Sequence, residues 1–179
     1  MERRKFLQIL SALCVTGVST PFYLGASQRN QKSVLNKDSH ALLHRLCDLI
    51  IPESDSPGAI KAGVVERFDF ALFHMTEDEQ RLWRADLTRV HTALNQYVKG
   101  DFMSLPKQKQ TLLLYEFDTL AYKNAPTDES IAYRQLKKEI GSAYYTTELG
   151  MTQELRYLPV PGKWEACIPF SDVGRTWAK

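Results

Sequence analysis

The chain has 179 residues, of which 44% are hydrophobic and 25% are charged. This length predicts one domain with a short appendage, and the composition argues against both a disordered chain and a membrane-embedded bundle. The formal net charge is +2, but the first 26 residues hold three of the 23 basic residues and one of the 21 acidic ones, so the remainder is neutral. A neutral domain without a basic patch is not expected to bind nucleic acid.

The first 26 residues have the order of an export signal. Three basic residues precede an apolar run, which is followed by Pro21 and by small residues that end near Ala26. The start of this segment resembles a twin-arginine signal, which the twin-arginine translocase reads on proteins that leave the cytoplasm already folded. The residues that carry this resemblance are Arg3, Arg4, Phe6 and Leu7. The alternative is an uncleaved anchor helix, in which Pro21 would be unfavourable.

Residues 27–37 are mostly polar and predict a linker, although Val34 and Leu35 could already dock on the domain. The domain is then expected to span residues 38–179. Asp38 or Ser39 is the expected N-cap of a first helix, because apolar residues follow at intervals of three and four. These apolar residues are Leu42, Leu43, Leu46, Leu49 and Ile50.

Three potential metal ligands lie on this first helix. His40, His44 and Cys47 are spaced four and three residues apart, so they could share one face. No fourth ligand lies at a suggestive spacing, and solvated histidines near the start of a helix are common. A metal site is therefore the weaker interpretation of this pattern.

A stiff loop is expected to join the first helix to a second one. Pro52 ends the first helix because it cannot donate a helical hydrogen bond, and turn-forming residues follow it. Pro57 and Gly58 fit the central positions of a type II turn, which requires a positive φ at the glycine. The second helix is expected to run from about Gly63 to His74.

A capping box marks the start of the third helix, because the Thr76 hydroxyl and the Glu79 carboxylate can each bind a free backbone N–H group. One apolar face then continues for about four turns until Gly100 is expected to stop the helix. The residues of that face are Trp83, Leu87, Val90, Leu94 and Tyr97.

Two further helices complete the predicted fold. Ser104 is expected to cap the fourth helix, with Pro106 in its first turn, and Thr127 or Asp128 the fifth. The fourth helix should bury Leu113, Phe117 and Leu120, widened by Leu112 and Ala121, and the fifth should bury Tyr133, Leu136, Ile140 and Tyr144. Because no stretch alternates with a period of two, the sequence predicts an all-α bundle of about five helices.

An irregular tail, rich in aromatic residues and proline, begins at about residue 145. Its extended backbone needs cover for its polar groups. The tail could wrap over its own helices, could meet another protein, or could do both, since Tyr and Trp are enriched at interfaces. The candidate interface residues are Pro57, Gly58, Tyr144, Tyr145, Tyr157, Trp164 and Cys167.

The cysteines leave three alternatives. Cys167 could bond to a partner chain, it could bond to Cys47 within the chain, or both thiols could remain free. Cys47 lies on an apolar helix, where a buried thiol is common.

No known catalytic motif is present. The sequence lacks a dinucleotide-binding glycine motif, a P-loop, a haem-attachment motif and a nucleophile elbow. We therefore predict neither a catalytic residue nor a cofactor-binding residue in this chain.

Two blocks of sequence together resemble the gluconate 2-dehydrogenase subunit 3 family. The first is Ile-Ile-Pro-Glu-Ser-Asp-Ser-Pro-Gly-Ala-Ile-Lys-Ala-Gly-Val at residues 50–64. The second is Tyr-Tyr-Thr-Thr-Glu-Leu-Gly-Met at residues 144–151, followed by residues 154–157, 159–162 and 167–169. The middle of the chain agrees with the family only in its helical pattern.

The resemblance implies a small periplasmic subunit without a cofactor of its own. Its partner would be a larger FAD-dependent dehydrogenase of the GMC type, which oxidises sugars, sugar acids or related alcohols, and a cytochrome c subunit often accepts the electrons. The complex could in addition bring this chain to the membrane. We expect this chain to bind, stabilise and help export that flavoprotein in a chaperone-like way. The alternatives are a stand-alone periplasmic binding or scaffold module, and an enzyme in its own right.

Overall fold

The computed structural model describes residues 33–160, 162 and 167–178. The signal-like segment, the linker up to residue 32 and Trp164 lie outside these residues. The described part is all-helical, as predicted, and it contains no strand apart from an isolated bridge between Arg156 and Trp177. No helix in this part is long and apolar enough to cross a membrane.

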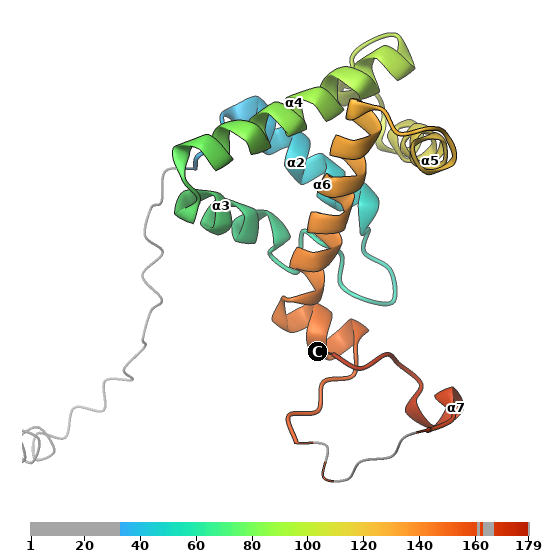
Figure 1. The fold of residues 1–179 in the computed structure, drawn as a ribbon. Helices are drawn as coiled ribbons and strands as arrows, with labels where there is room; N and C mark the ends of the chain where they lie inside the picture. Colours follow the sequence, from blue (N-terminus) through green and yellow to red (C-terminus); the bar gives the residue numbers. More distant parts are fainter. Residues whose placement is uncertain (1–32, 161, 163–166, 179) are drawn as a thin grey trace, which may run out of the picture. The chain divides into compact units, whose positions relative to one another are not determined.

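Five long helices form the body, in agreement with the predicted number (Figure 1). They are α2 (Lys37–Ile50), α3 (Val64–His74), α4 (Glu77–Val98), α5 (Lys107–Lys123) and α6 (Asp128–Tyr145). Three short elements accompany them, namely η1 (Phe102–Ser104), the π-helical turn η2 (Gly150–Glu154) and α7 (Phe170–Val173).

Helix α6 is the central helix of the body because it contacts α2, α3, α4 and α5. Its predicted inward residues are all buried in one hydrophobic core. The core residues of α6 are Ala132, Tyr133, Leu136, Ile140 and Tyr144. Because it packs against all four neighbours, the position of α6 determines which surfaces the others leave open.

The start of α2 differs from the prediction. Asn36 is the N-cap, and its side chain accepts a hydrogen bond from the Ser39 backbone N–H at 2.8 Å, so neither Asp38 nor Ser39 is the cap. Leu35 is buried and Val34 packs against the core. The end of the predicted linker therefore belongs to the packed body.

The predicted capping box of α4 is confirmed. The Thr76 backbone N–H donates to Glu79 Oε2 at 2.8 Å, and the Glu79 N–H donates to Thr76 Oγ1 at 3.3 Å. The Thr76 N–H bond first, and then the bond that the Thr76 hydroxyl donates to Glu79 Oε2 at 2.8 Å, lower the pKa of the Glu79 carboxyl. Thr127, one of the two predicted caps, starts α6 in the same way, with Ser130 as the reciprocal partner.

The predicted connection between the third and fourth helices is wrong in two details. Lys99, not Gly100, adopts the left-handed conformation that ends α4, with a φ of 53°. Ser104 lies in η1, where its hydroxyl donates to the Asp101 carbonyl at 2.8 Å, and Pro106 occupies the N-cap of α5.

The buried face of α5 agrees with the prediction at Ala121 and, half-buried, at Phe117, but its other buried residues are Gln110 and Leu114, and the predicted Leu113 is only half-buried. Leu112 is 59% exposed and Leu120 is exposed as well. The run of three leucines at residues 112–114 fits more than one register, so periodicity alone could not choose between them.

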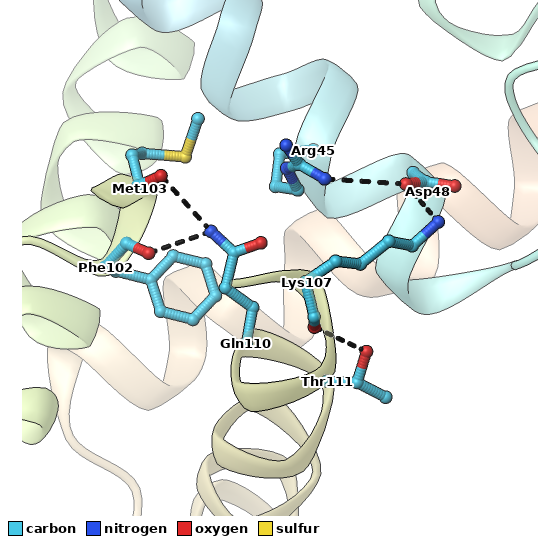
Figure 2. Close-up of polar contacts among 7 residues, drawn as sticks. All are labelled: Arg45, Asp48, Phe102, Met103, Lys107, Gln110 and Thr111. Carbon is cyan, nitrogen blue, oxygen red and sulfur yellow. Dashed lines mark hydrogen bonds and ion pairs between the residues drawn. The ribbon is translucent and has the colours of Figure 1, made fainter. Parts of the chain in front are cut away.

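Gln110 decides the register of α5 (Figure 2). Its side chain is fully buried, and its amide donates to the Phe102 carbonyl at 2.8 Å and to the Met103 carbonyl at 3.5 Å. These bonds join α5 to η1, where the Phe102 carbonyl also accepts from the Leu105 N–H at 3.3 Å, while Gln110 Oε1 has no partner among the described residues. Nearby, Lys107 ties α5 to α2 through an ion pair with Asp48 at 2.6 Å.

Candidate partner-binding surface

The loop between α2 and α3, residues 51–63, is a folded unit with its own hydrogen bonds. The Ala59 backbone N–H donates to the Ile51 carbonyl at 2.9 Å, which closes the loop. Lys61 forms an ion pair with Glu53 at 2.8 Å across it. As a result, residues 52–55 stay exposed while residues 57–59 are buried.

Gly58 is required for a different reason than the predicted type II turn. The described glycines with a positive φ are Gly63, Gly162 and Gly174, so the turn assignment is wrong. A Cβ atom on Gly58 would lie only 2.6 Å from the Glu53 backbone nitrogen and 2.9 Å from the Pro52 carbonyl carbon. Close approach of two backbone segments therefore selects glycine at this position.

Tyr144 joins this loop to the end of α6. Its hydroxyl donates to the Pro57 carbonyl at 2.6 Å, and its side chain is only 2% exposed. Burial raises the pKa of the Tyr144 hydroxyl, so it remains a protonated donor. Pro57, Gly58 and Tyr144 thus lie inside the domain, where they hold the two sequence blocks together rather than form its surface.

The other predicted interface residues lie elsewhere. Tyr145, Tyr157 and Cys167 are exposed, and Trp164 lies outside the described residues, as do the four residues of the signal. Their interface role stays a prediction.

Both described cysteines are free thiols, so the internal bond between Cys47 and Cys167 is not formed. Burial, together with the charge of Glu66, raises the pKa of the Cys47 thiol to about 12, which makes it unreactive. Among the described residues, no group of three or more His, Cys, Asp or Glu side chains could hold a metal ion. His40 instead pairs with Asp69 at 3.3 Å.

A groove that the sequence analysis missed opens between α3, α4 and α6. It has a volume of about 620 Å³, and most of its lining is apolar. Phe70 from α3 is 59% exposed, and Met75, just beyond α3, is 37% exposed. The available signal was Phe70 itself, which lies off the apolar stripe formed by Val64, Phe68 and Leu72.

The floor of the groove is held by aromatic and polar contacts. Trp83 packs against Phe68 with ring centroids 5.6 Å apart, and its Nε1–H donates to Glu139 Oε2 at 2.9 Å. Gln135 donates to the other oxygen of Glu139 at 2.7 Å. Because these side chains are fixed by one another, the groove is suited to accept an apolar side chain without rearrangement.

Comparison with known protein families gives a match over most of the chain. A family model described as Gluconate 2-dehydrogenase subunit 3 matches residues 37–162. No curated protein and no solved structure matches the chain.

The close approach at Gly58 predicts that Gly58→Ala lowers the free energy of unfolding by about 1–3 kcal/mol, because two backbone segments must move apart. Gly141, in the C-terminal half of α6, is the matched control because nothing lies within 4 Å of a Cβ atom there. Gly141→Ala should raise stability by about 0.5–1 kcal/mol. Urea unfolding of both variants measures the difference, and effects of the same sign would contradict this account.

The bond between Tyr144 and Pro57 predicts that Tyr144→Phe destabilises the domain by about 1–3 kcal/mol, because a buried carbonyl loses its donor. The neighbouring Tyr145 provides the control, since its side chain is exposed. Tyr145→Phe should change stability by less than about 0.5 kcal/mol. Equal urea midpoints for the two variants would show that the buried bond is not important.

Proposed function

The chain belongs to the gluconate 2-dehydrogenase subunit 3 family, and from this premise we propose that it is the non-catalytic small subunit of an FAD-dependent sugar dehydrogenase complex. The family makes it an accessory subunit of a dehydrogenase complex. The proposal adds that the partner is a GMC-type flavoprotein that oxidises sugars, sugar acids or related alcohols. It further adds that this chain binds, stabilises and helps export that flavoprotein to the periplasm.

The observation that carries the proposal is the apolar groove. Phe70 and Met75 expose apolar surface at its edge, above a floor that is already fixed by Trp83 and Glu139. Exposed apolar surface of this kind usually marks a site where another protein binds. A preformed site loses little conformational entropy on binding, which favours a tight complex.

Several partly buried carboxylates already serve the fold. Asp118 accepts hydrogen bonds from Tyr133 at 3.0 Å and from Lys137 at 2.6 Å, which joins α5 to α6. Asp48 binds Lys107, and Glu139 binds Trp83. These contacts give the acidic side chains structural roles, which supports the assignment of the redox chemistry to the FAD of the partner.

The segment that resembles a twin-arginine signal suggests a route by which the partner could leave the cytoplasm. A flavoprotein that receives its FAD in the cytoplasm must cross the membrane in folded form. If it has no signal of its own, a tightly bound subunit with a folded-protein signal can carry it across. The cytochrome c subunit of such complexes would then meet the assembled pair on the periplasmic side.

The second candidate function is a stand-alone periplasmic binding or scaffold module. It is favoured by the size of the groove, because small-molecule pockets typically have volumes of roughly 300–1,000 Å³. A stable monomer that purifies from its host without any flavoprotein would support this candidate over the first.

The export role predicts that the double substitution Arg3→Lys and Arg4→Lys retains both this chain and its flavoprotein in the cytoplasm, since lysine does not reproduce the guanidinium fork. Lys5→Arg is the control, because it keeps the charge and leaves the arginine pair intact. Cell fractionation with FAD-dependent dye reduction measures the location of the partner. Continued export of the flavoprotein with the double variant would disprove the role.

The groove predicts that Phe70→Ser combined with Met75→Ser reduces the affinity for the flavoprotein at least about tenfold, which is about 1.4 kcal/mol. Both side chains are exposed, so the free subunit should unfold at the wild-type urea concentration. The control is Leu112→Ser combined with Tyr115→Ser, an apolar pair on α5 that is at least as exposed. Unchanged affinity of the groove variant would exclude the groove as the binding site.

A further inference from the structure

The C-terminal arm is defined here as residues 150–160, 162 and 167–178. In the sequence it begins shortly after the last residue that lines the groove. Thr146 lines the groove, and the arm begins four residues later at Gly150. We propose that this arm is a preformed clasp that binds the same flavoprotein subunit as the groove, so that one partner covers both. This inference rests on the proposed function, and it adds the part of the surface that the groove does not provide.

The joint between α6 and the arm is rigid. Thr147 is buried, and its hydroxyl donates to the Tyr144 carbonyl at 2.7 Å while accepting from the Gly150 N–H at 3.0 Å. A Cβ atom on Gly150 would lie 2.2 Å from the Tyr144 carbonyl oxygen, so only glycine fits. The arm therefore leaves α6 in a fixed direction.

Hydrogen bonds join Arg156, near the start of the arm, to residues at its C-terminal end. The Arg156 N–H donates to the Thr176 carbonyl at 2.8 Å, and the Ala178 N–H donates to the Arg156 carbonyl at 2.9 Å. The Arg156 guanidinium lies 4.5 Å from the centre of the Trp177 ring. It also donates to the Val173 carbonyl at 3.3 Å. These contacts fix the base of the arm before any partner binds.

Beyond its base, the arm presents apolar side chains to solvent. Val160 is 78% exposed and Phe170 is 69% exposed. The other exposed apolar residues of the arm are Tyr157, Leu158, Ile168 and Trp177. Among the described residues, the hydrogen bonds made by residues 156–178 remain within the arm. The arm is thus not fastened to its own helices by these bonds, which favours the second of the two roles predicted for the tail.

The charges of the arm favour a protein over an anionic lipid surface. Binding to anionic lipid requires exposed Lys or Arg beside the apolar residues. The guanidinium of Arg156 is engaged with Trp177 and Val173, and that of Arg175 donates to the Gln153 carbonyl. Over residues 150–179 the sequence has four basic and three acidic residues, so this stretch carries no basic cluster of the kind that anionic lipid attracts. An apolar surface of the partner protein is therefore the occupant that fits.

The test uses the full-length chain and the flavoprotein that co-purifies with it. Tyr157→Ser combined with Phe170→Ser removes apolar contact surface, and Trp177→Ala releases the stacked base. We expect each to raise the dissociation constant at least tenfold without changing the urea midpoint of the free subunit. The control, Leu112→Ser with Tyr115→Ser on α5, should stay within twofold of wild type. Backbone amides of residues 157–160 and 170–173 should exchange more slowly with deuterium in the complex.

The possible failures are distinct from one another. If the wild-type chain associates with no flavoprotein, the proposed function fails and the clasp with it. If wild type and arm variants bind the flavoprotein equally well, only the clasp is overturned. A lower urea midpoint in the arm variants would instead mean that the arm packs on its own domain. Loss of binding to phosphatidylglycerol vesicles with unchanged flavoprotein affinity would identify lipid as the true occupant.

Discussion

The hydrogen bond from the Tyr144 hydroxyl to the Pro57 carbonyl connects the two ends of the domain, 87 residues apart in the sequence. It links the end of α6, which contacts every other long helix, to the loop that sets the start of α3. A bond of this kind contributes only about 1 kcal/mol net, but its loss leaves a buried polar group unpaired, which costs more. This contact therefore joins the loop before α3 to the end of α6, and both of these helices border the groove.

The contact between Tyr144 and Pro57 explains why several residues of the two sequence blocks are of the types observed. Pro57 and Gly58 are buried residues of the loop itself, and the buried Tyr144 side chain bonds to the Pro57 carbonyl. These residues are needed for close packing. The Glu53 backbone leaves no room for a side chain at position 58, and among the described residues only the Tyr144 hydroxyl donates to the Pro57 carbonyl. Pro57, Gly58 and Tyr144 of these blocks thus build the scaffold, whereas exposed residues of the groove and the arm, among them Tyr157 of the second block, are available for binding.

The sequence was sufficient where the signal is local. The capping box of Thr76 and Glu79 needs only four consecutive residues, and the inward face of α6 needs only its own period, so both were predicted correctly. The sequence was insufficient where a distant segment decides. Gly58 was assigned to a turn because the backbone that approaches it cannot be read from the loop residues.

The same distinction explains α5 and the groove. Gln110 is buried because its amide binds carbonyls of η1, an interaction that no hydrophobic period reveals, and the leucines beside it then fall into a different register. The groove is formed by three helices. Phe70 lines it only because α6 packs beside α3, which the sequence around Phe70 does not show. The α3 residues that line the groove include the buried Phe68 and Leu72 as well as the exposed Phe70, so no single face of α3 indicates it.

The exposed apolar surface of this subunit favours binding to its partner soon after folding. The groove and the arm both expose apolar side chains to solvent, and exposed apolar surface is unfavourable in water and promotes association with other proteins. In the proposed role, binding to the flavoprotein in the cytoplasm covers these surfaces before export. The folded pair would then cross the membrane as one unit, because separation would expose the same apolar area again. The apolar surfaces of the groove and the arm would thus couple assembly of the complex to its export.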